Sequence, residues 1–483
     1  MPEHATELHT PAWPTARSAR TGRRPIEDFF ARVGSDPLAA AFPDARRAHP
    51  PMRARAVPEP DVPLHWERLL AQPRRQRGTA YVHVPFCENH CLFCGFYRHP
   101  WREDAGAPYV DQVIAQVASL RQRAVLEGPP LRALYLGGGT PTALSARDIA
   151  RLVEALREGL PLAPDCEITL EGRIWSFTAD KVRAAFGAGV NRISLGVQTF
   201  DERLRRALGR KASRAEVIHC LEQLVATDAG AIVIDLLYGL PNQTPELWAA
   251  DLATVTALGL DGLDLYGLNL IPGTPLLSAV ASGKLVPIGH AELGRFYAAG
   301  AEALDRAGWL PISTTHWRRG VRERSIYNYE AKTGADLLAF GAGAGGSLGG
   351  TGFLLVSDLA DYARCIDTSS CPAVAITEAA PNAALHDAIR QGMERGRLAP
   401  DAPARLCRER TGTDFLALVE PLLAQWQEAG LLTRHHDFYD LTLAGRFWQV
   451  QMTSRLTDWI DQELSLRSAP REGDRDDRTR HDA

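Results

Sequence analysis

Short apolar runs alternate with stretches of helical periodicity from residue 79 onward. The runs are rich in β-branched residues, as buried parallel strands are. Six of them are expected to be strands: AYVHVPF, LRALYLG, CEITLEG, NRISLGVQ, AIVIDLLYG and GLDLYGLNL. Helices are expected between them, starting after the capping residues Ser145, Thr178 and Thr244. This pattern predicts an α/β fold, and six strand–helix units suit a partial (β/α)6 barrel of TIM type better than an open doubly wound sheet.

The alternation stops after the glycine run GAGAGGSLGG, which we interpret either as a substrate-facing flexible loop or as a linker. The remainder reads as several helices with a strand pair in EAGLLTRHHDFYDLTLAGRFW, which indicates a smaller, mostly helical, winged-helix-like domain. The predicted division is a disordered N-terminus (1–26), a segment packed on the barrel (27–78), the barrel core with an adjoining substrate region (79–350), the C-terminal helical domain (351–465) and a disordered tail (466–483).

Composition and charge narrow the class of protein. Hydrophobic residues make up 45% of the chain, enough for a substantial core, and 54 basic residues against 58 acidic ones leave no basic field for nucleic acid. The sequence contains neither an apolar run long enough to span a membrane nor the apolar core of a signal peptide, so we expect a cytoplasmic protein with no membrane partner.

A cluster of three cysteines is the most informative feature of the chain. Cys87, Cys91 and Cys94 follow the first strand with the spacing C-x3-C-x2-C, whereas the other five cysteines are scattered and are expected to be small buried hydrophobes. A structural zinc site would need a fourth ligand, such as His90 or His99. A four-iron, four-sulfur cluster held by only three cysteines would keep one iron open for chemistry.

Polar residues and glycines mark the ends of four further strands. Gly137, Gly138, Gly139 and Thr140 follow the second strand, where a turn without side chains lets a ligand approach the backbone. Glu171, Gln198 and Asp235 end strands three, four and five. Each alone could cap a helix or meet solvent, but barrel enzymes build their sites on this face, so their recurrence there favours a site.

The cysteine motif resembles that of the radical S-adenosylmethionine (SAM) superfamily. The resemblance implies a 4Fe-4S cluster on the three cysteines, whose free iron is chelated by SAM, and reductive cleavage of SAM to a 5'-deoxyadenosyl radical. The motifs YVHVPFC, GGGTPT, LGVQTF, LGR and IDLLYGLPNQT are similar in order to those of oxygen-independent coproporphyrinogen III dehydrogenase and its relatives. The SAM-binding residues that this resemblance implies are Tyr81, Phe93, Gly138, Gly139, Thr140, Glu171, Gln198, Arg210 and Asp235.

One feature separates the chain from the dehydrogenase, which carries a further cysteine after the glycine that follows the cluster motif. Here Gly95 is followed by Phe96 and Tyr97, and the segments FCENHCLFCGFYRHPW, DPLAAAFPDARRAHPPM and TTHWRRGVRERSIYNYE resemble the anaerobilin synthase family. That resemblance implies a methyltransferase that opens haem without oxygen to a linear tetrapyrrole and releases iron. It also implies an electron donor such as a flavodoxin or flavin reductase, and a haem-delivery protein.

The haem site is less defined by the sequence. His316 and Arg318 in STTHWRRG could meet the iron and a propionate, although a single histidine is more often a structural group. Two other functions remain open at this point: a haem chaperone with the same cluster motif, and the coproporphyrinogen dehydrogenase itself.

Overall fold

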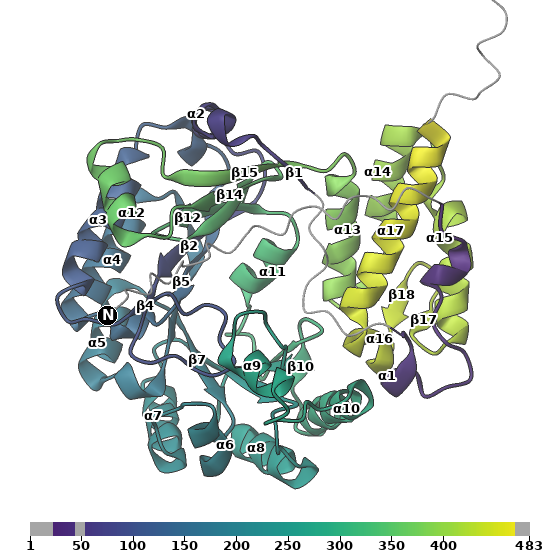
Figure 1. Ribbon diagram of the computed structural model, residues 1–483, viewed down its shortest axis with the longest axis horizontal. Helices are drawn as coiled ribbons and strands as arrows, with labels where there is room; N and C mark the ends of the chain where they lie inside the picture. The colour runs from purple at the N-terminus through teal and green to yellow at the C-terminus, as the bar shows by residue number, and fades with distance from the viewer. Residues whose placement is uncertain (1–22, 44–53, 469–483) are drawn as a thin grey trace, which may run out of the picture. The chain divides into compact units, whose positions relative to one another are not determined.

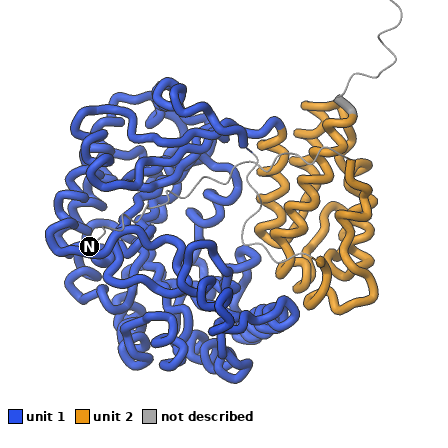
Figure 2. Tube along the Cα trace, viewed as in Figure 1, with its two compact units in different colours: residues 1–17, 52–381 blue, residues 18–51, 382–483 orange. Residues whose placement is uncertain are grey.

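The computed structural model describes residues 23–43 and 54–468, so most of both expected disordered ends, residues 1–22 and 469–483, lies outside the described residues. The chain forms two compact units (Figure 2). Of the residues that the structure describes, the first unit contains 54–381, and the second unit contains 23–43 and 382–468. No helix in the described part of the chain is long and apolar enough to cross a membrane.

The first unit is built on a sheet with the strand order β1-β15-β14-β13-β12-β2-β5-β6-β7-β8-β9-β11-β10 (Figure 1). The six predicted strands are neighbours in it, each parallel to the next: β2 (Gly78–Val84), β5 (Leu131–Gly138), β6 (Leu162–Gly172), β7 (Arg192–Gln198), β8 (Ala231–Tyr238) and β9 (Gly262–Gly267). β12 (Asp336–Phe340) adds a parallel strand beside β2. Because β1 and β10 remain as edges, the barrel is partial, as predicted.

Antiparallel strands extend both sides of this parallel core. They are β13 (Gly345–Leu348), β14 (Thr351–Leu355), β15 (Ala373–Ala379) and β1 (Ala54–Ala56) on one side, and β11 (His316–Arg318) with β10 (Leu310–Pro311) on the other. A separate pair, β3 (Phe86–Cys87) and β4 (His99–Pro100), lies in the cysteine segment. The core is therefore a parallel sheet with antiparallel margins.

Helices follow the parallel strands, as the periodicity predicts. The helices of the first unit are α2 (Val62–Leu70), α3 (Gly106–Ser119), α4 (Ala146–Gly159), α5 (Ala179–Ala188), α6 (Glu202–Ala207), α7 (Arg214–Ala226), α8 (Pro245–Ala257), α9 (Pro275–Ala281), α10 (His290–Arg306), α11 (Ile326–Lys332) and α12 (Leu359–Asp367), with 3-10 turns η2 (Glu59–Asp61), η3 (Ala124–Leu126), η4 (Pro141–Ala143) and η5 (Ile174–Ser176). The side chains of Ser145 and Thr244 cap α4 and α8 as expected. Thr178 precedes α5 but makes no side-chain cap hydrogen bond, so it marks only the position of the helix start.

The glycine run is part of the sheet and is held in place. The amide of Gly341 donates to Gln116 Oε1 at 2.9 Å, and the amide of Ala342 donates to the Tyr109 hydroxyl at 3.0 Å. Gly341 has φ +95°, and a Cβ there would stand 2.4 Å from the Tyr109 hydroxyl. The glycines therefore allow close packing, and neither the flexible-loop nor the linker interpretation describes them.

The first unit also extends beyond the expected boundary at residue 350. β14 pairs with β13, and β15 pairs with both β14 and β1, so residues 351–379 continue the large sheet. The division in the structure falls after Pro381. The segment that forms this hairpin is rich in glycine, as linkers also are. Composition alone therefore does not distinguish a hairpin from a linker.

The second unit is helical with a small sheet. Its elements are η1 (Ile26–Phe29), α1 (Pro37–Ala40), α13 (Ala383–Glu394), α14 (Asp401–Thr411), α15 (Phe415–Glu428), α16 (Leu443–Phe447), α17 (Gln449–Ser468), β16 (Arg397–Leu398), β17 (Leu432–Arg434) and β18 (Tyr439–Leu441). β17 and β18 are the predicted strand pair, and β16 completes a three-stranded antiparallel sheet.

The N-terminal segment contributes aromatic side chains to this second unit. The Phe29 ring lies 5.5 Å from Trp459, and Phe42 lies 5.7 Å from Trp448, both in edge-to-face geometry. Residues 27–43 thus pack with the C-terminal helices, whereas β1 and α2 join the first unit. The expectation that all of 27–78 packs on the barrel holds only for its later part, because the aromatic partners of the earlier part lie more than 400 residues away in sequence.

Truncation of Phe29 tests this assignment. Because Phe29 is fully buried, we expect Phe29→Ala to lower the free energy of unfolding of the second unit by about 3–5 kcal/mol. Hydrogen exchange resolved by peptide would show faster exchange in α15 and α17 while β5–β8 keep wild-type protection. Val33→Ala, at a side chain that is 50% exposed, is the control. Faster exchange confined to the first unit would contradict the assignment.

Candidate active site at the carboxyl ends of the strands

The inner face of the parallel sheet carries one partly exposed residue near the carboxyl end of each core strand. Both sequence neighbours of each are buried, as alternation along a strand requires when one face packs on helices. These residues are Tyr81, Tyr135, Glu171, Gly196, Asp235 and Tyr266. The register places Tyr81 beside Tyr135 and Gly196 beside Asp235, so the set lies around one concave interior.

The cysteine segment begins directly after β2, at this carboxyl end. Cys87 and Cys91 are buried and Cys94 is partly buried. Donors point at two of the sulfurs: Thr140 Oγ1 lies 3.4 Å and Arg173 Nη2 3.6 Å from Cys87 Sγ, and the amide of Phe96 lies 3.4 Å from Cys94 Sγ. Burial raises the pKa of the Cys87 thiol, while Arg173 and Thr140 act in the opposite direction. The surroundings are those of sulfurs that carry negative charge as metal ligands.

The donor set fits an iron–sulfur cluster better than zinc. His90 Nε2 lies 3.1 Å from the carbonyl oxygen of Cys94, and His99 Nε2 lies 3.2 Å from that of Ser357, so one ring nitrogen of each expected fourth zinc ligand contacts the backbone. In the described residues no three side chains are arranged to hold a single metal ion. In a four-iron cluster each thiolate bonds a different iron, which spaces the sulfurs more widely than around one ion.

The glycine turn after β5 packs beneath the cysteine segment. The amide of Gly139 donates to Val84 O at 2.8 Å, and a Cβ on Gly139 would stand 2.5 Å from Phe86 O. Gly138 has φ +105°, which a residue with a side chain rarely adopts. Thr140 follows, buried, with its hydroxyl on Cys87. The predicted turn and the predicted cysteine loop are therefore in direct contact.

Arg210 presents a guanidinium without a full set of partners. It lies near the cysteine segment, with its Cζ 5.8 Å from the Phe93 ring centroid, and its buried Nε has no hydrogen-bond partner among the described residues. Burial lowers the pKa of Arg210, while Cys91 and Cys94 raise it. A buried donor without an acceptor is costly, so this position is suited to an anionic group such as a carboxylate.

Gln198, Arg210 and Asp235 meet at Gly196. A Cβ on Gly196 would stand 2.6 Å from Gln198 Nε2 and 3.1 Å from Arg210 Nη2. Gln198 itself has φ +73°, at a register shift between β7 and β8. A positive φ is unfavourable for a residue other than glycine and is found where the surrounding structure enforces it, often at binding sites. Burial, followed by the charges of Asp264 and Glu171, raises the pKa of Asp235.

Glu171 lies on β6, the strand next to β7, and its carboxyl faces the glycine turn. Its Oε2 would stand 2.6 Å from a Cβ on Gly137, so the first glycine of the turn leaves room for this carboxyl. Burial raises the pKa of Glu171 to about 7, opposed by a hydrogen bond from the Gly138 amide and by Arg173 and Arg210. The site thus has a carboxylate on one side and a guanidinium on another, a pairing that suits a ligand with an amino and a carboxylate group.

Of the two residues predicted to bind haem, His316 on β11 is paired with Asp264 of the neighbouring strand β9, and Arg318 lies farther from the carboxyl ends. His316 is buried, with Nδ1 2.8 Å from Asp264 Oδ1 and Nε2 3.0 Å from Glu323 Oε1. Arg318 pairs with Gly262, the first residue of β9, and so lies toward the amino end of that strand. Both ring nitrogens of His316 face carboxylates, and the haem contacts of His316 and Arg318 stay a prediction.

Two residues that contribute to the interior, Arg173 and Tyr327, are not among those predicted from the sequence. Arg173 contacts Cys87 and also Asn89, and Tyr327 from α11 stacks on Tyr135 with ring centroids 4.5 Å apart. Arg173 lies two residues after Glu171, a spacing that could have placed it on the same side of β6 as the predicted site. Tyr327 gave no such signal, because α11 is distant in sequence from β5.

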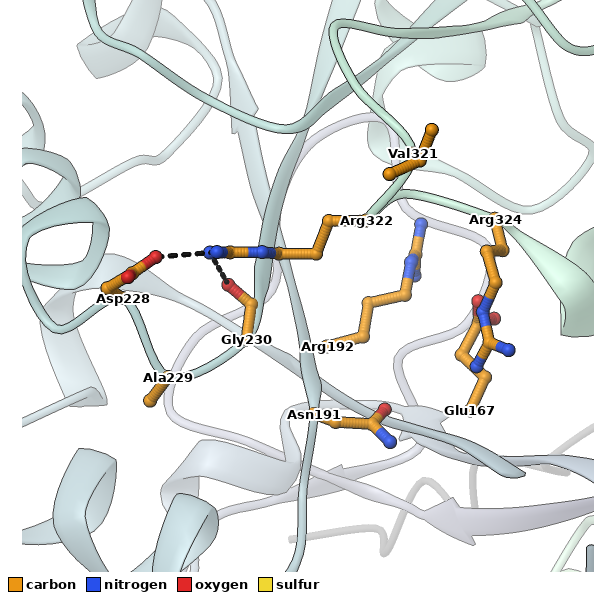
Figure 3. A pocket seen from close by; sticks show the side chains of 9 residues that line it. All are labelled: Glu167, Asn191, Arg192, Asp228, Ala229, Gly230, Val321, Arg322 and Arg324. Carbon is orange, nitrogen blue, oxygen red and sulfur yellow. Dashed lines mark hydrogen bonds and ion pairs between the residues drawn. The ribbon is translucent and has the colours of Figure 1, made fainter. Parts of the chain in front are cut away.

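A pocket of about 340 Å³ lies at the opposite, amino end of β7 and β8 (Figure 3). Its arginines already have acidic partners: Arg322 with Asp228 at 2.6 Å, Arg324 with Asp165 at 3.1 Å, and Arg192 with Glu323 at 2.9 Å. None of the predicted site residues lines it. The carboxyl-end cluster is therefore the candidate active site.

Comparison with known proteins agrees with this geometry. The Radical SAM superfamily matches residues 81–253. Anaerobilin synthase of Escherichia coli O157:H7 is 39% identical over 439 residues, covering 90% of this chain and 95% of that protein. Heme chaperone HemW of Lactococcus lactis is 29% identical and covers 60% of this chain and 75% of its own length.

Among solved structures, coproporphyrinogen III oxidase (HemN) from Escherichia coli has the same fold, with a TM-score of 0.71 and 24% identity, covering 85% of this chain and 96% of that one. The likeness to HemN concerns the fold, and the identity to anaerobilin synthase extends over nearly the whole of both chains. The chain belongs to the anaerobilin synthase family of the radical SAM superfamily.

Proposed function

We propose that this protein cleaves SAM reductively and uses the resulting 5'-deoxyadenosyl radical to open haem without oxygen. A methyl-derived carbon of SAM is transferred, the macrocycle becomes a linear tetrapyrrole and iron is released. The observation that carries this proposal is the convergence of the three cysteines, the glycine turn and the incompletely paired Arg210 at one end of the sheet, in a chain similar to anaerobilin synthase.

Each side chain has a role that follows from its chemistry. Cys87, Cys91 and Cys94 would hold the 4Fe-4S cluster, which supplies the electron for SAM cleavage when bound. Arg210 offers a planar fork of donors to the SAM carboxylate, and Glu171 accepts hydrogen bonds from the amino group. Gln198 and Asp235 bind the ribose hydroxyls. Tyr81, Phe93 and the Gly138–Thr140 turn enclose the ligand.

The haem chaperone is the second candidate, because HemW is also similar to this chain. Anaerobic incubation of the reconstituted protein with haem, reductant and SAM, followed by mass analysis of the products, separates the candidates. The proposed enzyme forms a methylated linear tetrapyrrole and 5'-deoxyadenosine, whereas a chaperone returns intact haem. Decarboxylation of coproporphyrinogen III would instead indicate the dehydrogenase. An electron donor such as a flavodoxin or flavin reductase, and a haem-delivery protein, are the partners that the reaction calls for.

Alanine replacements test the proposed cluster ligands. We expect replacement of Cys87, Cys91 or Cys94 by alanine to remove most of the roughly four irons bound per chain, together with the brown chromophore. Iron and sulfide assays on anaerobically purified protein measure this. Cys407→Ala, at a buried cysteine in α14, should keep the full content. Unchanged iron in all three loop variants would show that the cluster lies elsewhere.

Two further replacements test the proposed ribose contacts. Asp235→Ala should weaken SAM binding by roughly tenfold to a hundredfold, because a hydrogen bond to a carboxylate is worth about 1.5–3 kcal/mol. Gln198→Ala should weaken it by roughly twofold to tenfold, because a hydrogen bond between neutral groups is worth about 0.5–1.5 kcal/mol. Isothermal titration with cluster-loaded protein would measure the affinity, and iron content should stay unchanged. Asp361→Asn, at an exposed carboxylate on α12 that pairs with Arg364, is the control. Wild-type affinity in both variants would remove these residues from the site.

The pH dependence of SAM binding tests the role of Glu171. With its pKa raised by burial to about 7, Glu171 is mostly ionised above that pH and mostly neutral below it. A neutral acid accepts hydrogen bonds less strongly, so SAM binding should be roughly threefold to tenfold weaker at about pH 6 than at about pH 8. Glu171→Gln should bind SAM weakly with little change over this range. An equal pH slope in wild type and variant would assign the titration to another group.

A further inference from the structure

His316, Asp264 and Asp235 form a row across three neighbouring strands. In the strand register His316 of β11 pairs with Asp264 of β9, and Asp264 pairs with Asp235 of β8. Directly paired residues on adjacent strands project to the same face of a sheet, so the three side chains lie next to one another on the inner face. Asp235, at one end of the row, is a residue of the proposed SAM site.

His316 bridges two buried carboxylates. Its Nδ1 lies 2.8 Å from Asp264 Oδ1 and its Nε2 lies 3.0 Å from Glu323 Oε1. Both ring nitrogens thus lie within ion-pair distance of buried carboxylate oxygens, an environment that favours the imidazolium form. Burial acts to lower the pKa of His316, but the Asp264 and Glu323 carboxylates raise it to about 9. The ring is therefore charged at neutral pH.

Arg192 completes the group. Its guanidinium donates to both oxygens of Glu323, with Nε 2.9 Å from Oε2 and Nη2 3.1 Å from Oε1. Two cations, Arg192 and His316, thus balance two anions, Glu323 and Asp264, and all four side chains are at most 4% exposed. Figure 3 shows Arg192 of this group, together with Glu167, among the residues that line the pocket.

This charge balance affects the pKa of Asp235, which stands at one end of the row. Asp264 raises the pKa of Asp235, after burial itself, while Arg192 and His316 lower it. Without the charge of His316, the Asp264 carboxylate would repel an ionised Asp235 in a region of low dielectric. Burial and the neighbouring carboxylates already raise the pKa of Asp235, and loss of the His316 charge would raise it further and make Asp235 a poorer acceptor. The charged and titratable groups that face this row are Glu167, Glu171, Arg192, Tyr135, Tyr266 and Glu323.

We propose that His316 is a positioning residue of the SAM site, which neutralises and orients Asp264 beside Asp235, the proposed acceptor for the SAM ribose. This inference rests on the proposed function, since it assumes that Asp235 binds SAM. It replaces direct haem contact as the role of His316.

Paired variants test the charge argument. His316→Gln removes the imidazolium charge, and we expect SAM affinity to fall about tenfold, with haem affinity and the haem absorption bands unchanged. In the double variant His316→Gln/Asp264→Asn, the uncompensated carboxylate is also gone, and affinity should recover to within about threefold of wild type. A merely structural role for His316 would give additive losses instead of rescue.

His386→Gln is the matched control, because His386 is also buried and lies 2.9 Å from Asp461, but in the second unit. It should lower thermal stability without changing SAM affinity. If His316→Gln fails to fold, Asp264→Asn alone decides: affinity within about threefold of wild type supports the proposal, and a loss above about tenfold overturns it.

The remaining outcomes are also decisive. Wild-type SAM affinity in folded His316→Gln, or altered haem bands with SAM binding intact, would overturn the positioning role and, in the second case, restore haem contact. Failure of the double variant to recover would overturn the charge argument. Failure of the wild-type protein to bind SAM at all would instead refute the proposed function.

Discussion

A charge inside a protein is stable only when an opposite charge or a full set of hydrogen bonds lies against it, and the interior of this curved sheet is organised by that constraint. Arg192 and Asp264 on parallel strands, His316 on the antiparallel strand β11 and Glu323 in the following connection come together where solvent hardly reaches, and their charges balance one another. Removing any one of them would leave a buried charge without a partner. The scaffold of the site is therefore electrostatic as well as hydrophobic.

The same constraint separates scaffold from site. Toward the amino ends of β7 and β8, the arginines of the pocket have carboxylate partners already. At the carboxyl ends, Arg210 keeps a buried Nε without a partner among the described residues, and burial holds the pKa of Glu171 near 7. Groups whose charges are incompletely compensated by the protein are the ones that a charged ligand can satisfy. The electrostatics thus indicate the same end of the sheet as the cysteines do.

Much of this arrangement could be predicted from the sequence because its signals are local. Each core strand is a short apolar run, and the cysteine motif, the glycine turn and the strand-end residues Glu171, Gln198 and Asp235 lie within or directly after such runs. Since parallel strands align their carboxyl ends, local positions translate directly into a shared location. The site residues were therefore accessible to sequence reasoning, although their exact contacts, such as Thr140 with Cys87, were not.

What escaped prediction depends on contacts between distant segments. Phe29 packs on Trp459, which is distant in sequence. The glycine run continues the sheet because β13 pairs with β12 and β14. His316 illustrates the same limit in the site itself: its sequence context, a histidine beside arginines, suits a haem contact as well as a buried ion pair. Two features of the fold determine the environment of the imidazole ring. The register of β11 against β9 places His316 beside Asp264, and the chain after β11 places Glu323 beside Arg192. A side chain that can carry charge takes its function from the partners that the fold supplies, and sequence spacing alone does not name those partners.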